Sequence, residues 1–311
     1  MPLIAVVGPT AVGKSKLALH LSQRFRGEIV SADSRQVYRY MDIGTAKPSL
    51  AERHLIPHHL IDIADPDEPF SLTMFQVSAH AAIDDIEARR KIPFLVGGSG
   101  LYVWSVLEGW RVPHVPPDRK LRQSLEQKAA VEGNYALYQE LQQADPVAAA
   151  KIMPGNTRRI IRALEVYLAT GKPASQLWQK RGLDFPVLII GLTTARSHLY
   201  HMIDSRIDEM IEKGLVEEVR GLLIKGYDLS LPSMSSIGYR QVGMFLGGKL
   251  DLASAIEQTK HGTHRIARHQ YAWFRLSDER IGWLDIRENL ENEAGKAVEK
   301  FLDQFGSWST P

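Results

Sequence analysis

One segment near the start of the chain constrains its fold more than any other part of the sequence. Residues 8–15 read GPTAVGKS and match the pattern G-x-x-x-x-G-K-[ST] of a phosphate-binding loop. The apolar run 3–7 before this loop predicts a buried strand, and a helical pattern begins at Lys14. A strand, a loop and a helix in this order predict an open α/β sheet with an anion-binding site at its carboxyl edge.

Further along the chain, short strand patterns alternate with helical ones, as in parallel α/β sheets. The strands are expected at residues 3–7, 28–31, 59–63, 92–96, 187–191 and 281–285. Helices are expected at residues 14–25, 71–90 with Ser71 as the N-cap, 199–213, a segment that ends near Lys225, and 252–276.

A long segment without sheet-type strand patterns separates the fourth and fifth of these strands. It begins near Pro113, ends near Pro186 and contains helical patterns. The predicted fold class is therefore α/β, with a P-loop NTPase-like parallel sheet flanked by helices and an inserted small all-helical domain. We assign residues 1–112 and 186–311 to the core with its C-terminal helices, and residues 113–185 to the insertion.

Composition excludes several classes of site. The chain has no cysteine, so disulfides, zinc–thiolate sites, iron–sulfur clusters and thiol nucleophiles are ruled out. No stretch reaches the roughly 18 apolar residues of a membrane-spanning helix, and the apolar N-terminus lacks the basic start of a signal peptide. The net charge of +2 does not decide whether the partner is a nucleic acid, because backbone binding depends on local clusters of cations.

The phosphate loop indicates which atoms would hold an anion. The backbone N–H groups of residues 8–15 and the helix N-terminus would surround a diphosphate. Lys14 would neutralise its charge, and the hydroxyl of Ser15 would bind Mg²⁺. The loop recognises phosphates and not the group attached to them, so these residues alone leave the substrate open.

Two further segments follow strands at the same edge of the predicted sheet. Asp33 comes just after the second strand and could accept a proton from a nucleophile, although an exposed turn aspartate or a helix N-cap is the alternative. The segment GGSGLY at 97–102 follows the fourth strand, so Ser99 could contact a leaving diphosphate. A purely structural strand-to-helix turn explains this segment equally well.

The chain resembles the tRNA dimethylallyltransferases, also called tRNA isopentenyltransferases, in their bacterial form. The resemblance spans nearly the whole sequence and keeps the family's order of motifs. These motifs are GPTAVGKS (8–15), SADSRQVY (31–38), MDIGTAKP (41–48), PHHLIDI (57–63), GGSGLY (97–102), NTRRIIRALEVY (156–167), IGYRQ (237–241) and the block 263–275.

This resemblance implies an activity. Enzymes of the family transfer a dimethylallyl group from dimethylallyl diphosphate to N6 of the adenosine 3′ to the tRNA anticodon, position 37, with Mg²⁺, and release diphosphate. The expected partners are thus the donor and the anticodon stem-loop of tRNA, and we expect a cytoplasmic monomer that does not contact a membrane. The alternatives are a small-molecule P-loop kinase and a non-catalytic RNA-binding module.

The resemblance also implies roles for individual residues. Asp33 receives the N6 proton, Thr10 contacts the diphosphate and Arg206 clamps it, so these three are the expected catalytic residues. The expected diphosphate-binding residues are Gly8, Pro9, Thr10, Ala11, Val12, Gly13, Lys14, Ser15 and Ser99, with Ser15 also binding the metal.

The expected tRNA contacts come from several parts of the chain. They are Asp33, Ser34, Arg35, Gln36, Ser99, Arg122, Arg158, Arg159, Arg162, Gly238, Tyr239, Arg240, Gln241, Arg265, Arg268 and Arg275. Helical spacing supports the last three, because it places them on one face with His261 and Ala272, while Ala267, Tyr271 and Phe274 lie on another face that is expected to pack on the core. His264 and His269 stand where the family pattern has arginines. The pair His58–His59 is expected to make local hydrogen bonds rather than bind metal.

Overall fold

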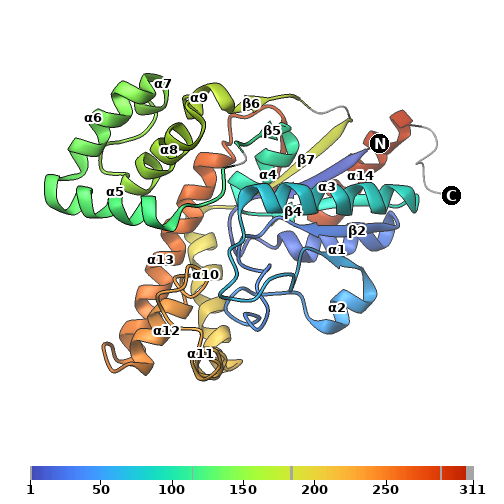
Figure 1. Cartoon of the computed structure of the whole chain (residues 1–311). Helices are drawn as coiled ribbons and strands as arrows, with labels where there is room; N and C mark the ends of the chain where they lie inside the picture. Colours follow the sequence, from blue (N-terminus) through green and yellow to red (C-terminus); the bar gives the residue numbers. More distant parts are fainter. Residues whose placement is uncertain (1, 114, 183–184, 288, 306–311) are drawn as a thin grey trace. The chain divides into compact units, whose positions relative to one another are not determined.

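The computed structural model describes residues 2–113, 115–182, 185–287 and 289–305. The chain divides into two compact units, one of residues 1–107 and 184–311 and the other of residues 108–183 (Figure 1). In the described residues, no helix is long and apolar enough to cross a membrane.

The first unit is built on one parallel sheet with the strand order β3-β2-β4-β1-β7-β8. The last residue of β1, Val7, pairs in register with Gly97 of β4 and Gly191 of β7. The loop that follows β1 therefore lies beside the carboxyl ends of both neighbouring strands. The strands are β1 (Leu3–Val7), β2 (Gly27–Ser31), β3 (His58–His59), β4 (Ile92–Gly97), β7 (Val187–Thr193) and β8 (Ile281–Asp285).

One predicted strand is wrong in its extent. The run expected at residues 59–63 pairs with β2 only through His58 and His59. Leu60 and Asp62 have φ angles of +64° and +57°, and this left-handed backbone cannot continue an extended strand. The apolar pattern of this run therefore reflects burial of Leu60 and Ile61 in a loop.

Helices flank this sheet. The expected N-cap is confirmed, because Ser71 Oγ accepts the N–H of Met74 at 3.2 Å at the start of α3. The helices of this unit are α1 (Lys14–Arg24), α2 (Leu50–Leu55), α3 (Leu72–Ala88), α4 (Gly100–Leu107), α10 (Arg196–Glu212), α11 (Leu215–Ile224), α12 (Tyr239–Leu246), α13 (Leu252–Trp273), α14 (Leu290–Leu302) and the short η1 (Asp303–Phe305).

The core of the first unit holds the central strand in place. Ile4 and Val6 of β1 are fully buried, together with Leu17 of α1 and Val298 of α14, in one apolar cluster. Each such side chain contributes roughly 1.5–3 kcal/mol when it is removed from water. The strand that leads into the phosphate loop is thus rigid, which fixes the position of the loop.

The second unit has its own apolar core, which includes Leu137, Leu141 and Ile160. Its helices are α5 (Arg119–Glu132), α6 (Asn134–Ala144), α7 (Pro146–Ala149), α8 (Thr157–Thr170) and α9 (Ala174–Leu177). This unit also contains a short antiparallel ribbon of β5 (Trp110–Arg111) and β6 (Gln179–Lys180), which the helical reading of the sequence did not include. The ribbon pairs only two residues from each strand, too few to produce a strand pattern.

Candidate active site

The phosphate loop connects β1 to α1 and has the backbone that its glycines allow. Gly8 has a φ of +139°, and a Cβ atom on it would lie 2.6 Å from the carbonyl oxygen of Leu192. Gly13 has a φ of +93° and is the N-cap of α1. Both positions therefore require glycine, and the N-terminus of α1 faces the region in which the loop would hold an anion.

Two cations lie near the loop without a carboxylate ion-pair partner among the described residues. Burial, together with the positive charge of Arg206, lowers the pKa of Lys14 to about 7, and the charge of Asp33 partly opposes this shift. Burial likewise lowers the pKa of Arg206, again opposed by Asp33. Lys14 Nζ donates to the carbonyl oxygen of Pro9 at 2.6 Å. The site thus carries more positive than negative charge in a partly dry environment, which favours a multiply charged anion.

Asp33 lies just past β2, at the same edge of the sheet. Its Oδ1 accepts the N–H of Arg35 at 2.8 Å, so the carboxylate closes a turn in its own segment. The same carboxylate lies within electrostatic reach of Lys14 and Arg206. Asp33 is therefore both a turn residue and a residue of the site, because the turn holds its carboxylate beside the two cations.

The loop after β4 reaches both neighbouring loops. Ser99 Oγ accepts the N–H of Ser34 at 3.1 Å, which joins this loop to the segment that contains Asp33. Gln270 of α13 joins it to the phosphate loop, because its Oε1 accepts the N–H of Thr10 at 2.7 Å and its Nε2 donates to the carbonyl oxygen of Gly98 at 3.0 Å.

Gln270 is a functional residue that motifs and spacing alone do not single out. The signal in the sequence is a polar residue directly beside the apolar stripe of Ala267, Tyr271 and Phe274. A glutamine beside an apolar stripe needs partners for its amide, and here both partners are loop backbone groups.

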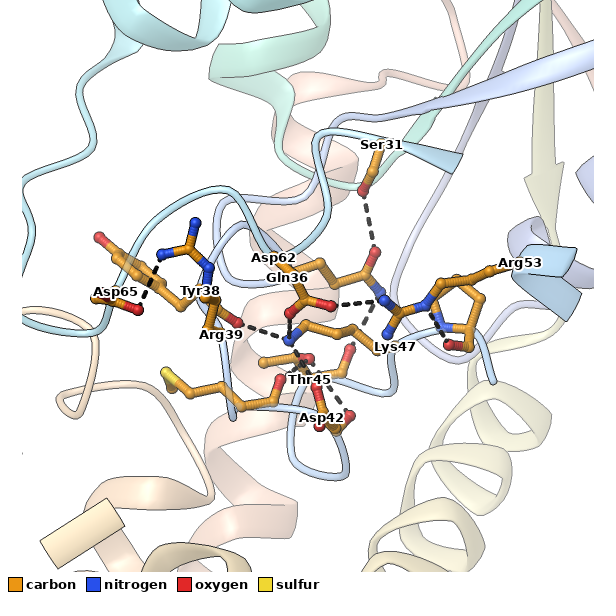
Figure 2. Close-up of polar contacts among 12 residues, drawn as sticks. Ser31, Gln36, Tyr38, Arg39, Asp42, Thr45, Lys47, Arg53, Asp62 and Asp65 are labelled. Atoms are coloured by element: carbon orange, nitrogen blue, oxygen red, sulfur yellow. Dashed lines mark hydrogen bonds and ion pairs between the residues drawn. The ribbon is translucent and has the colours of Figure 1, made fainter. Parts of the chain in front are cut away.

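Gln36, which the resemblance assigns to tRNA contact, is largely buried and has a structural role in the protein. Ser31 Oγ donates to Gln36 Oε1 at 3.0 Å, and Gln36 Nε2 donates to the carbonyl oxygens of Thr45 and Ala46, both at 3.2 Å (Figure 2). Both N–H donors of its amide thus hold residues 45–46, and its oxygen accepts the Ser31 hydroxyl, so the side chain ties these residues to the end of β2.

A charged network holds the rest of the same segment. The side chain of Lys47 is only 1% exposed, and its Nζ lies 2.7 Å from Asp42 Oδ1 and 2.5 Å from Asp62 Oδ1. Arg53 donates to the other carboxylate oxygen of Asp62, and the two cations lower the pKa of Asp62 against the effect of its burial (Figure 2). The motif MDIGTAKP (41–48) is therefore fixed to Asp62 through Lys47, and to the segment 31–38, which contains Asp33, through Gln36.

The motif IGYRQ also proves to be largely structural. Gly238 and Tyr239 are buried, and the Tyr239 hydroxyl donates to Glu218 Oε1 at 2.6 Å. Glu218 in turn accepts three backbone N–H groups of residues 42–44. Gln241 Oε1 accepts the N–H of Gly238 at 2.9 Å, which caps α12. Of the residues of this motif that are expected to contact tRNA, Gly238 and Tyr239 are therefore buried in the protein and support its structure, whereas Arg240 is exposed.

The basic face predicted for α13 is present along the helix itself, because His261, Arg265, Arg268 and Ala272 are exposed and Ala267 is buried. Arg275 is also exposed, but α13 ends at Trp273, so helical spacing does not place Arg275 on this face.

His264, one of the two histidines at a family arginine position, is held within the fold. Its ring stacks on Tyr200 at 4.0 Å between centroids, and its Nε2 lies 2.8 Å from Asp204 Oδ1. Arg268 Nη1 and Arg196 Nε both donate to the hydroxyl of Tyr200, at 2.9 and 3.0 Å. Two guanidinium groups therefore converge on one neutral oxygen, so their positive charge stays available to phosphates.

In the helical unit, the expected tRNA arginines divide into two pairs. Arg122 donates to both carboxylate oxygens of Glu165, at 2.8 and 2.7 Å, and Arg162 also pairs with this carboxylate, whose side chain is only 1% exposed. Arg158 and Arg159, by contrast, are exposed on α8 and make no ion pair among the described residues.

The described residues contain no cluster of three or more His, Asp or Glu side chains that could hold a metal ion. His58 Nδ1 lies 2.7 Å from the carbonyl oxygen of Ile56, and His59 Nε2 lies 2.7 Å from Glu28 Oε2, so the pair makes local hydrogen bonds as predicted. Ser15 is exposed at the start of α1 and lines a cavity of about 140 Å³. One hydroxyl beside a diphosphate fits Mg²⁺, because this ion keeps several waters and takes phosphate oxygens as ligands.

Comparison with known proteins relates this site to one family. The model of the IPP transferase family matches residues 36–277. A tRNA dimethylallyltransferase of Roseiflexus castenholzii is 54% identical over 275 residues, which cover 88% of this chain and 90% of the relative. This chain belongs to the IPP transferase family. The resemblance inferred from the sequence motifs is thereby confirmed.

Solved structures of the family have the same fold. The tRNA isopentenylpyrophosphate transferase of Bacillus halodurans superposes with a TM-score of 0.69 at 40% identity, over 98% of this chain and 99% of that one. A eukaryotic dimethylallyltransferase whose structures capture it acting on tRNA superposes with a TM-score of 0.83 at 30% identity, over 99% of this chain and 80% of that one. The predicted α/β P-loop-like fold class is confirmed by these neighbours and by the parallel sheet.

Proposed function

We propose that this chain transfers a dimethylallyl group from dimethylallyl diphosphate to N6 of the adenosine at tRNA position 37 and releases diphosphate. The family supports tRNA prenyl transfer, so the enzyme class expected from the sequence is confirmed. The donor, the acceptor position and the residue roles are our proposal. The observation that carries them is the pair of partly desolvated cations, Lys14 and Arg206, beside the phosphate loop and Asp33.

The charge balance of the site suits a diphosphate leaving group. As the allylic C–O bond breaks, negative charge grows on the bridging oxygen of the donor. Lys14 and Arg206 together with the N–H groups at the start of α1 supply fixed positive charge where that charge grows. Because these groups are already desolvated, they stabilise the leaving group without first losing water.

Asp33 is placed to handle the nucleophile. The N6 amine forms its bond to the allylic carbon and must then lose one proton, which Asp33 takes as a carboxylate. An exocyclic amine is a weak nucleophile, so holding it in line with the C–O bond matters as much as the proton transfer. The turn that fixes Asp33 through the N–H of Arg35 provides this rigidity.

Mg²⁺ bound at the Ser15 hydroxyl would neutralise further charge on the diphosphate. Lys14 and Ser15 are adjacent at the start of α1, so the loop would contact the donor from the side of its diphosphate.

The exposed arginines supply the binding of the tRNA backbone in this proposal. Arg265 and Arg268 lie on the basic face of α13, Arg275 follows the end of this helix, and Arg158 and Arg159 lie on α8. The target base must leave its stack in the anticodon loop to reach Asp33, as for other enzymes that act on bases. Since tRNA is the substrate, the reaction belongs to the cytoplasm, and we propose that one copy of the chain suffices.

The test is transfer from labelled dimethylallyl diphosphate to an unmodified tRNA with adenosine at position 37. The matched control is the same tRNA with guanosine at that position. We expect label on N6 of the adenosine in the first tRNA and none in the second, located by nuclease digestion and mass spectrometry. Transfer of phosphate from labelled ATP instead, with no prenyl product, would support the small-molecule kinase alternative and refute the proposal.

A further inference from the structure

We propose that Gln270 is a positioning residue for prenyl transfer: it holds the phosphate loop and the loop after β4 in one arrangement. This inference rests on the proposed function, because it concerns how the same site is organised. Gln270 does not need to touch either substrate. It acts through Thr10 and Gly98, to which its side chain is hydrogen-bonded.

A primary amide is the group that this position requires. Its Oε1 accepts the Thr10 N–H at 2.7 Å, while its Nε2 donates to the Gly98 carbonyl at 3.0 Å. One loop therefore needs an acceptor and the other needs a donor, and an amide offers both a fixed distance apart. A carboxylate would keep only the bond to Thr10, and an aliphatic side chain of the same length would keep neither.

The contact between α13 and the loop after β4 is closely fitted around this residue. A Cβ atom on Gly98 would lie 2.2 Å from Gln270 Nε2, and one on Gly100 would lie 2.2 Å from Trp273 Cγ. Trp104 Nε1 also donates to the carbonyl oxygen of Trp273 at 2.9 Å. The end of α13 is thus held against this loop at Gly98 and against α4 at Gly100 and Trp104, which fixes the position of Gln270.

These contacts connect the proposed catalytic groups. From Thr10 the connection passes through Gln270 to Gly98, then from Ser99 to Ser34, the neighbour of Asp33. Among the described residues, no other side chain hydrogen-bonds to both the phosphate loop and the loop after β4. The sheet places the ends of β1, β4 and β2 side by side, and the amide of Gln270 adds the link that fixes the phosphate loop to the loops beyond these strands.

The position of Gln270 on α13 adds a second consequence. Arg268 lies two residues earlier on the same helix, on the exposed basic face. A tRNA phosphate bound at Arg268 would contact the same helix whose Gln270 holds the phosphate loop. The structure thus links the proposed tRNA face to the proposed diphosphate site through one helix.

The variant Gln270→Met removes both hydrogen bonds and keeps the side-chain length. We expect its single-turnover transfer rate to fall about ten- to a hundredfold, because small displacements of reacting groups cost this much. Gln270→Glu should recover part of the loss, since it keeps the bond to Thr10. Gln258 is an exposed glutamine on the same helix, so Gln258→Met is the matched control and should transfer at the parent rate.

A positioning role is separated from a folding or binding role by two further measurements. The dissociation constants of Gln270→Met for tRNA and for dimethylallyl diphosphate should stay within about threefold of the parent values, with the loss confined to the rate. The Thr10 amide should exchange its hydrogen faster in Gln270→Met than in the parent or in Gln258→Met.

The parent enzyme distinguishes the possible failures. If the parent does not transfer a prenyl group, the proposed function fails, and the Thr10 exchange rate still decides whether Gln270 holds the loop. If the parent transfers normally and Gln270→Met matches it in rate, the positioning role is refuted. Equal Thr10 exchange in the parent and in Gln270→Met would also refute it.

Discussion

Lys14 and Arg206 belong to one partly desolvated site, where burial and the charge of Arg206 lower the pKa of Lys14 to about 7. A lysine in water has a pKa of about 10.4. In the folded chain the side chain of Lys14 is therefore close to half-deprotonated at physiological pH. An anion that binds beside it restores the charged form. The site is therefore electrostatically prepared for its ligand rather than compensated within the protein.

This relationship predicts proton uptake on donor binding. Between about pH 7 and pH 10 the free protein has Lys14 largely neutral, and dimethylallyl diphosphate should draw a proton onto it. Donor affinity should accordingly fall as pH rises above 7. Calorimetry in buffers of different ionisation enthalpy measures the number of protons taken up on donor binding. Lys14→Met is the control, because it lacks uptake by Lys14 but keeps any proton exchange by the ligand itself. The difference between the two proteins is therefore the uptake by Lys14. Equal uptake by both proteins would show that Lys14 stays charged in the free site.

The lowered pKa of Lys14 also determines how the free energy of unfolding changes with pH. Above pH 7 the folded chain releases the Lys14 proton, while the unfolded chain keeps it up to about pH 10. The unfolded state then binds more protons, so this residue makes the free energy of unfolding rise with pH across that window. The increase of the chemical denaturation midpoint from pH 7 to pH 9 should therefore be smaller in Lys14→Met than in the parent. An increase unchanged by the substitution would contradict the lowered pKa.

Asp33→Asn tests the proposed proton acceptor. Asparagine keeps an oxygen that can accept the N–H of Arg35, so the turn should survive. We expect the transfer rate to fall by about two to four orders of magnitude, the usual cost of losing a general base, with tRNA still bound. Asp67 is an exposed aspartate of the same unit, and Asp67→Asn should transfer at the parent rate. Single-turnover rates of Asp33→Asn within about tenfold of the parent would show that proton removal does not need this carboxylate.

Local patterns predicted the fold and part of the site. The strand β1, the phosphate loop and the N-cap at Ser71 each depend on neighbours within a few residues, and all were found. The basic face of α13 followed from helical spacing in the same way. Such features are fixed by local backbone geometry, which a sequence contains directly.

The remaining site features depend on partners far away in the chain. The sequence does not show that the Gln36 amide binds the carbonyl oxygens of Thr45 and Ala46, or that the Tyr239 hydroxyl donates to Glu218. Gln270 and Thr10 are separated by 260 positions. No spacing rule relates such pairs, so only the folded chain reveals them.

Tyr239→Phe distinguishes the structural from the tRNA-binding reading of IGYRQ. The substitution leaves Glu218 without one of its donors, so we expect the chain to lose about 1–3 kcal/mol of unfolding free energy. The affinity for tRNA should not change once the protein is folded. Tyr135 is 60% exposed, and Tyr135→Phe is the control that should leave stability unaltered. A stable Tyr239→Phe protein with weakened tRNA binding would restore the original assignment.

The last prediction concerns the helical unit, where two pairs of arginines should behave in opposite ways. Arg158 and Arg159 are exposed and make no ion pair among the described residues, so we propose that they contact phosphates. Replacing both with Ala should flatten the dependence of log affinity for tRNA on log salt concentration by about 0.7–0.9 per lost contact. Thermal stability should not change.

Arg122 and Arg162, in contrast, neutralise the buried carboxylate of Glu165. Replacing either with Ala should destabilise the chain by about 1–3 kcal/mol, because the carboxylate loses a charged partner inside the unit. Arg122 and Arg162 should contribute little to the salt dependence, since Glu165 already engages their charge. Each pair thus serves as the control for the other, as both remove cations from the same unit. If the Arg158 and Arg159 variant keeps the parent slope while Arg122→Ala flattens it, tRNA binding breaks the Glu165 ion pairs and the assignment is reversed.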